Sequence, residues 1–434
     1  MLKVNRDGSD RSKLLICSVF WNGLSQILFL KQYFKGIILG LLEILMITRI
    51  PWIFDSLLGM LDLGHTNTAV PIAQRDNSAF LLINGVAAIV LLLCYLAIYI
   101  YYINEALESY QYYCKNGVFK GSNRTISEYL GEGLPIIGIL PTLILVVGLV
   151  VLPLLVAFLA AFTNFSAPVH VAPSMTFDWV GLDNFIALFG GSKEWTSAFI
   201  RVFIWTLCFA LISTVLCYIG GLLLAYILHH NQLKFRPVIQ TFLMLPYAVP
   251  AVISMIVWKN LLNGSFGVVN NTLMSMHLIH EPIGWLSDPV MAKITCIMIS
   301  LWAGYSYFML LLLTTLNTIP AAMYDAAATE GATRGQTIRK LVIPLLLHRT
   351  IPFILLAFTQ NFNNFTTVFF LTGGNPALEN TTTTSAGATD TLITWIYHLT
   401  FELMQFNYAS VIIVIVCIIL IPFTIWQFKK SKLY

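Results

Sequence analysis

The segment PTLILVVGLVVLPLLVAFLAAF, residues 141–162, contains no charged side chain. A helix of about 20 apolar residues is long enough to cross the roughly 30 Å hydrocarbon core of a bilayer. The segment lies within a longer charge-free stretch between Glu132 and Asp178. It therefore predicts a transmembrane helix near residues 136–163, and this prediction decides the class of fold.

The rest of the chain has the same apolar character. Of its 434 residues, 58% are hydrophobic and 10% are charged, and the mean hydropathy is +0.79. Soluble domains carry about 25% charged residues. A soluble enzyme, a disordered chain and a disulfide scaffold are therefore excluded, and a net charge of +4 is too small to indicate nucleic-acid binding. The composition predicts an all-α, polytopic membrane protein.

Charge-free stretches recur along the chain, and together with one weaker apolar segment they predict about eight transmembrane helices. Seven of them lie near residues 79–103, 136–163, 198–228, 238–261, 291–317, 350–371 and 408–427. An eighth, near residues 34–54, contains Glu43 and Arg49. The stretch Leu14–Leu30 is also apolar, but it is short and a Trp-Asn-Gly sequence interrupts it, so we expect an interfacial helix there.

The positive charges indicate an orientation. With eight spans and the N-terminus inside, 18 of the 24 lysine and arginine residues fall in inner segments. Cytoplasmic segments of membrane proteins are enriched in these residues. We therefore expect both the N-terminus and the C-terminus to be cytoplasmic.

No arrangement of residues predicts catalysis. The eight histidines are dispersed, the seven cysteines lack metal-ligand spacing, and no phosphate-binding GxxxxGK[ST] loop occurs. We expect a chain that is not an enzyme, holds no metal and uses no cofactor of its own.

The inner segment 318–349 contains the sequence YDAAATEGATRGQTIRKLVIP, residues 324–344. Asp325 is expected to begin a short helix, where its charge suits the positive end of the helix dipole. The alanines that follow favour the helix and leave its surface bare. Gly331 is expected to end this helix before a basic amphipathic stretch. The segment thus predicts two short helices that can approach another protein closely, with an ordinary connecting loop as the alternative.

Amide side chains within a predicted span indicate a sugar pathway. Asn361 and Asn364 are three residues apart and are expected to share one helix face, flanked by Gln360. Asparagine within a span is costly unless it faces protein or water. An amide offers both a donor and an acceptor, as paired sugar hydroxyls require. Hydrogen bonding between neighbouring helices is the alternative.

Aromatic residues on other spans support the same interpretation. Tyr305 and Tyr307 supply aromatic surface for the apolar face of a sugar ring, and Gly304 leaves room beside them. Two prolines, Pro246 and Pro250, lie on either side of a further tyrosine and are expected to distort their helix, as happens where backbone lines a cavity.

Several motifs resemble known transport proteins. The segment 324–344 resembles the cytoplasmic coupling loop of ABC importer permeases, with an acidic residue, two alanines, a glycine six residues on and an Ile-Pro ending. Motifs over residues 136–428 resemble the maltose/maltodextrin permease subunit of the MalF type. These are LPYAVP at 245–250, SFG at 265–267, WAGYSY at 302–307, NFNNF at 361–365 and LTGG at 371–374.

The resemblance implies a fold and two sets of residues. It implies a MetI-like core of six spans over residues 131–434, with a coupling loop at 320–346, after an N-terminal region 1–130 with an interfacial helix and two spans. The residues that match the ATPase-coupling element are Asp325, Ala326, Ala327, Gly331 and Pro344. Those that match the substrate contacts are Tyr247, Gly304, Tyr307, Gln360, Asn361 and Asn364. Gln360 departs from the pattern, because the family's best-known member has an aromatic residue there.

The resemblance also implies a function. The chain is expected to be a permease subunit in a bacterial inner membrane, in an ATP-driven importer that moves maltose/maltodextrin-type oligosaccharides by alternating access. Its expected partners are a second permease in a heterodimer, an ABC ATPase dimer that hydrolyses the ATP, an extracellular sugar-binding protein, the oligosaccharide and membrane lipid.

Other functions stay open at this point. Another carbohydrate, such as glycerol phosphate or a different oligosaccharide, is one alternative. An ion-coupled secondary transporter is a second, although it would usually need charged residues within its spans, and Glu43 is the only acidic residue within a predicted span. A membrane enzyme or a structural subunit is a third, and it lacks a cluster of Asp, His or Cys.

Overall fold

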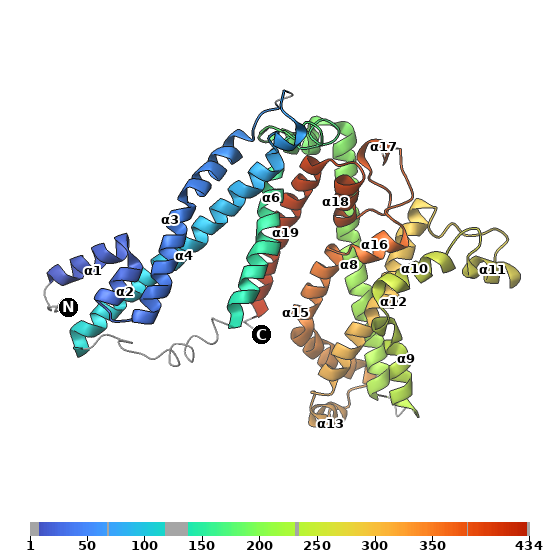
Figure 1. Ribbon diagram of the computed structural model, residues 1–434. Helices are drawn as coiled ribbons and strands as arrows, with labels where there is room; N and C mark the ends of the chain where they lie inside the picture. Colours follow the sequence, from blue (N-terminus) through green and yellow to red (C-terminus); the bar gives the residue numbers. More distant parts are fainter. Residues whose placement is uncertain (1–7, 67–68, 118–137, 231–233, 380, 432–434) are drawn as a thin grey trace. The chain divides into compact units, whose positions relative to one another are not determined.

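The computed structural model describes residues 8–66, 69–117, 138–230, 234–379 and 381–431 (Figure 1). These residues form helices and turns, with one isolated antiparallel β-bridge between Thr163 and Trp179. The chain divides into two compact units, an N-terminal unit, Met1–Trp179, and a C-terminal unit, Val180–Tyr434. The predicted domain boundary between residues 130 and 131 lies outside the described residues and stays a prediction.

Among its described residues, the N-terminal unit contains three helical segments that are long and apolar enough to cross a membrane: α3, α4 and the segment Gly138–Ala160. Its elements are α1 (Gly8–Phe20), α2 (Asn22–Leu28), α3 (Tyr33–Asp62), η1 (Ile72–Gln74), α4 (Ser78–Asn116), the π-helical turn η2 (Val147–Val151) and α6 (Leu152–Ala160). The predicted interfacial stretch forms α1 and α2, each of which is too short to span. Their place at the membrane interface stays a prediction.

Glu43 lies in the first half of α3 and is nearly fully buried, with 6% of its surface exposed. Its carboxylate accepts hydrogen bonds from the backbone N–H of Asn22 at 2.6 Å and of Gly23 at 3.2 Å. These N–H groups open α2 and have no partner within that helix. Gly23 also lets α2 approach α3 closely, because a Cβ there would lie 2.4 Å from the backbone nitrogen of Gly40. The charged residue in the span therefore holds α2 against α3.

The C-terminal unit consists of long helices joined by short ones. Its first elements are α7 (Asp183–Ile186), η3 (Ala187–Gly191), α8 (Lys193–His230), α9 (Arg236–Ala248), α10 (Ala251–Leu261), α11 (Val268–Ser275) and α12 (Pro289–Leu316). They are followed by α13 (Ala321–Thr329), α14 (Arg334–Thr337), η4 (Ile338–Val342), α15 (Ile343–Phe362), α16 (Thr366–Leu371), α17 (Thr381–Thr384), α18 (Leu392–Phe401) and α19 (Phe406–Ser431).

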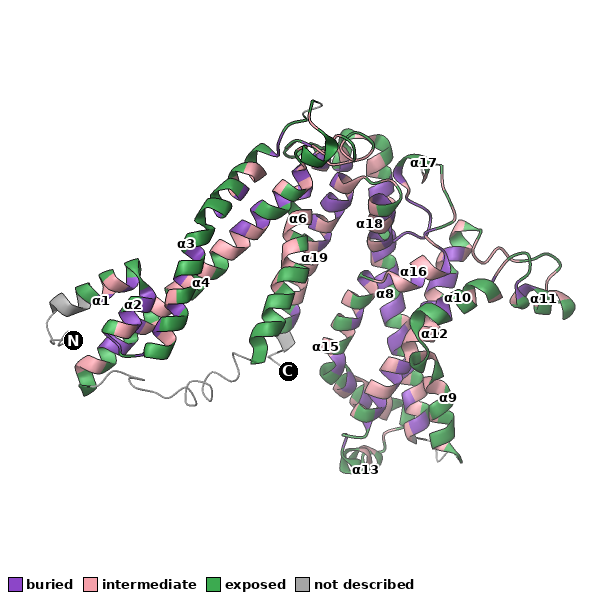
Figure 2. Cartoon of the chain, viewed as in Figure 1, coloured by how far each residue is buried: buried purple, intermediate pink, exposed green. Residues whose placement is uncertain are grey.

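The core of the C-terminal unit forms where α8 packs along α12 (Figure 2). Glycines bring the two helices together: a Cβ on Gly221 would lie 2.6 Å from the Cβ of Phe308, and one on Gly304 would lie 2.7 Å from the sulfur of Cys217. Small residues are common at helix contacts in membranes because they allow close packing. The outward faces of the long helices are apolar, as a lipid environment requires; Leu149 of the N-terminal unit, for example, is 72% exposed.

In the described part of the chain, seven helical segments are long and apolar enough to span, and a bent pair raises the number to eight if it counts as one span. The pair is α9 and α10, which meet at an angle of 90°. The prediction of one span near 238–261 was thus only partly right, because the expected distortion is a complete break. Pro250 has no N–H to continue the helix, and it directly precedes α10.

The predicted span at 350–371 has the wrong bounds. The helix runs from Arg334 to Phe362, and α16 follows as a separate short helix. Charged residues at the start of a membrane helix reach water along their long side chains, so a charge-free stretch underestimates the helix at that end. At the other end, Asn363 leaves the helical conformation and closes α15.

Candidate functional site

A cavity of about 530 Å³ lies within the C-terminal unit, among α9, α10, α12, α15 and α16. All six residues predicted to contact substrate line it: Tyr247, Gly304, Tyr307, Gln360, Asn361 and Asn364. The first and the last of these residues are more than 100 positions apart in the chain, and the tertiary structure brings all six to one space. We call it the amide cavity.

The helix break after α9 places one wall of the amide cavity. Tyr247 lies in the last turn of α9 and is 59% exposed. Its ring centroid is 6.5 Å from that of Tyr307 on α12. The Ser306 hydroxyl donates to the carbonyl of Leu243 at 2.8 Å, which ties α12 to α9 beside the rings. The pair of tyrosines gives the cavity an aromatic wall.

Tyr305 does not belong to this wall, contrary to expectation. It is absent from the described residues that line the cavity. Its Cβ lies 3.6 Å from where a Cβ on Gly220 of α8 would be, so it packs against α8. Gly304 lines the cavity, but its lack of a side chain is also required by the contact with Cys217.

The amides of the opposite wall are partly engaged by the protein. Asn361 donates through Nδ2 to the Thr214 hydroxyl at 2.9 Å, which is the interhelical bond named above as the alternative. The Oδ1 of Asn364 accepts from the backbone N–H of Thr367 at 2.9 Å and so caps α16. The remaining amide group of each side chain keeps its capacity to bind a ligand in the cavity.

The reason given for pairing these two residues was wrong. α15 ends at Phe362, so Asn361 lies in the helix and Asn364 in the turn before α16, and the two do not share a helix face. The same turn exposes Asn363, which also lines the cavity and which the sequence interpretation missed. The Asn-Asn sequence was the available signal, because asparagine favours turns over helix interiors.

The described residues that line the amide cavity carry no charge. Hydroxyl groups of Ser300, Thr366 and Thr367, also missed, add to its polar surface. Among the described residues of the whole chain, no three or more His, Cys, Asp and Glu side chains are arranged to hold a metal ion. The cavity can therefore offer hydrogen bonds and aromatic surface, which suit a neutral polar ligand.

The LTGG motif at 371–374 lies beside a buried carboxyl group, that of Asp390. Asp390 accepts hydrogen bonds from the Gly387 N–H at 2.7 Å and from the Thr394 hydroxyl at 2.8 Å. Gly374, at φ +81°, leaves the space that this carboxyl group occupies. Burial raises the pKa of Asp390, and the nearby His398 acts in the opposite direction. This cluster orders the loop between α16 and α18 and does not line the cavity.

The predicted coupling segment forms α13, a turn and α14. Asp325 is exposed in the middle of α13, so the prediction that it begins the helix was wrong; the helix begins after Pro320. The predicted end is confirmed: α13 stops at Thr329, and Gly331 follows at φ +76°, a left-handed conformation that favours glycine.

Three of the predicted coupling residues line one groove of about 610 Å³. Ala326, Ala327 and Gly331 contribute small surfaces to it, and Glu330 and Lys340 add charges of opposite sign. We call it the alanine groove. Asp325 and Pro344 are exposed but are not among the described residues that line it. Pro344 lies in the first turn of α15, which follows the π-helical turn η4 along the chain.

Comparison with known proteins decides the family. Residues 218–428 match the family described as binding-protein-dependent transport system inner membrane component. The chain is 32% identical over 412 residues to the galactooligosaccharides transport system permease protein GanP of Bacillus subtilis, which covers 94% of this chain and 95% of GanP. It is 31% identical over 442 residues to the maltodextrin transport system permease protein MalC of Streptococcus pneumoniae, which covers 99% and 98%. The chain belongs to the MalF-type family of ABC sugar importer permeases.

A solved structure shows the same fold. A chain in the crystal structure of a bacterial alginate ABC transporter, in complex with alginate pentasaccharide-bound periplasmic protein, is 21% identical with a TM-score of 0.54, over 70% of this permease and 96% of that chain. The predicted family, the all-α polytopic fold and the function as an ABC sugar importer permease are confirmed. The permease is a multi-pass bacterial membrane protein and a transport subunit.

Proposed function

We propose that this permease translocates neutral oligosaccharides of the maltodextrin type, with the amide cavity as the substrate site. The observation that carries the proposal is the convergence of all six predicted residues on one uncharged cavity. Its volume of about 530 Å³ falls within the usual range of roughly 300–1,000 Å³ for small-ligand sites. The relatives named for maltodextrin and galactooligosaccharide transport support an oligosaccharide substrate.

The walls match the two kinds of surface that a sugar presents. The faces of Tyr247 and Tyr307 can pack against the apolar face of a pyranose ring, and the amides of Asn361 and Asn364 can bind its hydroxyl groups. Gln360 is exposed to the cavity and can bind a further hydroxyl where an aromatic residue would stack. We therefore expect hydrogen bonding to contribute more at this position than stacking.

The lack of charge in the cavity separates the candidate substrates. Glycerol phosphate would bring a negative charge to a wall in which no described residue is a cation, and desolvating an unpaired charge is costly. An ion-coupled mechanism would also need a charged residue, and none of the described residues that line the cavity is charged. A galactooligosaccharide, by contrast, has the same surface chemistry as a maltodextrin, and the likeness to GanP makes it the second candidate.

The alanine groove is the proposed contact with a separate ABC ATPase dimer. Its small side chains allow close approach by another protein, and its residues are mostly exposed. We infer that this end of the C-terminal unit is cytoplasmic, as are both termini, because lysine and arginine gather there. The basic residues of this end are Lys234, Arg236, Arg334, Arg339, Lys340 and Arg349.

The proposed transport cycle needs three further partners. A second permease completes a heterodimer, an extracellular sugar-binding protein delivers the substrate, and lipid surrounds the spans. ATP binding to the ATPase dimer would move α13 and expose the amide cavity outward, and hydrolysis would reverse this change. Such coupling requires ligands that bind the two states with different affinities.

Reconstitution in liposomes tests the substrate. The permease is assembled with its second permease, ATPase and binding protein, and ATP-dependent uptake is measured for maltotriose, a galactooligosaccharide and glycerol 3-phosphate. We expect uptake of a neutral oligosaccharide that requires the ATPase. Uptake of glycerol 3-phosphate alone would contradict the proposed substrate, and sugar uptake by the permease without the ATPase would favour an ion-coupled transporter.

A matched pair of glycine substitutions tests the coupling. Gly331 and Gly335 both have open space where a Cβ would be, but only Gly331 has a positive φ. Gly331→Val should reduce sugar uptake per ATP hydrolysed, since a β-branched residue strains this turn, whereas Gly335→Val should have little effect. Equal uptake per ATP in the two variants would count against the coupling role of the turn.

A further inference from the structure

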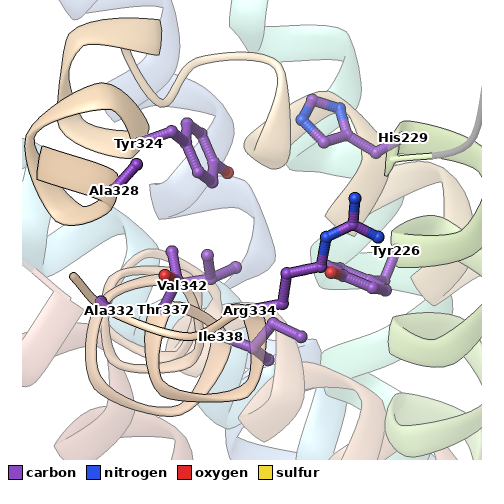
Figure 3. Close-up of a pocket in the computed structure, with 9 residues that line it drawn as sticks. All are labelled: Tyr226, His229, Tyr324, Ala328, Ala332, Arg334, Thr337, Ile338 and Val342. Atoms are coloured by element: carbon purple, nitrogen blue, oxygen red, sulfur yellow. The ribbon is translucent and has the colours of Figure 1, made fainter.

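A second, smaller cavity of about 250 Å³ lies beside α13 and shares the lining residues Ala332 and Thr337 with the alanine groove (Figure 3). Tyr226 and His229 reach it from the end of α8, Tyr324 from α13, and Arg334 and Thr337 from the start of the long helix Arg334–Phe362. We call it the Arg334 pocket. It joins the end of a membrane helix to the proposed coupling helix.

The polar groups of this pocket converge. Figure 3 shows the Arg334 guanidinium beside Tyr226 and directed toward His229, while the Tyr324 hydroxyl points into the same space from α13. The rings of His229 and Tyr324 are 6.5 Å apart. His229 is held in place through Nδ1, which lies 3.1 Å from the Oδ1 of Asn317.

The electrostatic balance of the pocket is positive. No carboxylate in the described part of the chain forms an ion pair with Arg334. Asp325 and Glu330, the acidic residues nearest in sequence, are not among the described lining residues. Arg334 is the first residue of the helix Arg334–Phe362, whose start is closed by a capping box between Thr333 and Gln336, so the guanidinium and not the helix start supplies the positive charge.

We propose that the Arg334 pocket binds a phosphate group. A guanidinium with hydroxyl donors around it is the arrangement that recognises phosphate by charge-assisted hydrogen bonds. The volume is below the roughly 300 Å³ at which sites for larger organic ligands begin, so it suits a small anion or a headgroup and not a nucleotide. Two sources offer this chemistry at a membrane surface, an anionic phospholipid headgroup and a soluble phosphate.

A phosphate in this pocket would contact α8 and α13 at once. If α13 moves relative to the spans, the ligand would stabilise one arrangement over the other and so regulate coupling. This consequence rests on the proposed coupling role of α13. The binding itself does not, and it is measured without transport.

The test compares two arginine variants of the full chain purified in a neutral detergent. Arg334→Gln removes the guanidinium from the pocket. Arg339→Gln removes the same charge as a control, because Arg339 lies five residues further along the same helix and outside the described lining. Binding of inorganic phosphate is measured from the shift of the thermal unfolding midpoint against chloride at equal ionic strength. Tyr226→Phe is a milder variant that removes one hydroxyl.

We expect Arg334→Gln to weaken phosphate binding about tenfold or more, and Tyr226→Phe to weaken it less, while Arg339→Gln binds as the unaltered chain does. An equal loss of phosphate binding in both arginine variants would overturn the proposal. So would an unaltered chain whose unfolding midpoint does not respond to phosphate and which retains no lipid. Native mass spectrometry of chains taken from phosphatidylglycerol and from phosphatidylcholine bilayers separates the sources. If the unaltered chain retains phosphatidylglycerol and the Arg334→Gln variant loses it, the ligand is the lipid headgroup. If both chains retain the lipid equally and the unaltered chain still binds inorganic phosphate, the ligand is the soluble anion.

Discussion

Two regions of the permease bury polar side chains among apolar helices, and they do so with opposite results. In the N-terminal unit, the Glu43 carboxylate accepts hydrogen bonds from the backbone N–H groups at the start of α2. In the amide cavity, Asn361 and Asn364 each use one group for the protein, and the helix breaks beside them leave about 530 Å³ of space. A polar residue in a span therefore indicates a ligand site only where the backbone also opens a cavity.

The difference has a physical cause. A straight helix satisfies its own backbone, so a polar side chain on it must find a partner on a neighbouring helix. Where Pro250 and Asn363 interrupt their helices, short helices diverge and side chains line the gap. Three of the four predictions below test whether polar residues of the first region serve stability and those of the second serve binding. The prediction for Gly304 tests whether a residue that lines the cavity is needed for packing.

Glu43→Leu should give the largest effect, and it should appear in stability. Two buried N–H groups would lose their acceptor at a cost of about 1–3 kcal/mol each, so we expect a loss of about 2–6 kcal/mol and a lower thermal unfolding midpoint. Glu43→Gln keeps an acceptor oxygen and should lose less. Sugar uptake per folded molecule should be unchanged in both, and a selective loss of uptake would show that Glu43 takes part in transport.

Asn361→Leu should act mainly on uptake. Removing the amide leaves a sugar hydroxyl without its partner, at a cost of about 1–3 kcal/mol, and we expect sugar affinity to fall about 10- to 100-fold. The measurement is the concentration dependence of uptake in the assembled transporter. Asn271→Leu is the control, since this asparagine is exposed on α11 and away from the cavity. If sugar affinity is unchanged in Asn361→Leu, this amide does not belong to the substrate site.

Gly304→Ala should act on packing. The added Cβ would lie 2.7 Å from the sulfur of Cys217, and overpacking of this kind costs about 1–3 kcal/mol. The thermal unfolding midpoint should fall, and a second substitution, Cys217→Ala, should restore it. If the double variant stays as unstable as Gly304→Ala, the contact between α8 and α12 is not the reason for the glycine.

Asn363→Ala should give the smallest effect. This exposed amide lines the cavity, and losing one hydrogen bond of about 1 kcal/mol lowers affinity about fivefold. Stability should not change. Asn364→Ala provides the contrast, because it also removes the cap from Thr367 and should lower stability together with affinity. Identical behaviour of the two variants would show that the turn acts as one structural unit.

The sequence predicted the members of the cavity better than the reasons for their placement. Asn361 and Asn364 were paired through helical spacing, yet the helix ends between them, and Asn363 was missed for the same reason. Asp325 was placed at a helix start and lies mid-helix. The motif resemblance depends only on residue identity, so it predicted the right residues despite these errors. Helical periodicity gives a wrong placement wherever a helix ends within the motif.

The sequence by itself determined that the permease is an all-helical membrane protein, because charge-free stretches of sufficient length have one stable arrangement in a bilayer. It also determined the family through local motifs. Only the tertiary structure decided that Glu43 caps a helix, that α9 and α10 meet at 90°, and that tyrosines and asparagines from separate helices face one cavity. These features depend on which helices pack together and where each one breaks, and contacts between distant residues leave no periodic trace in a single sequence.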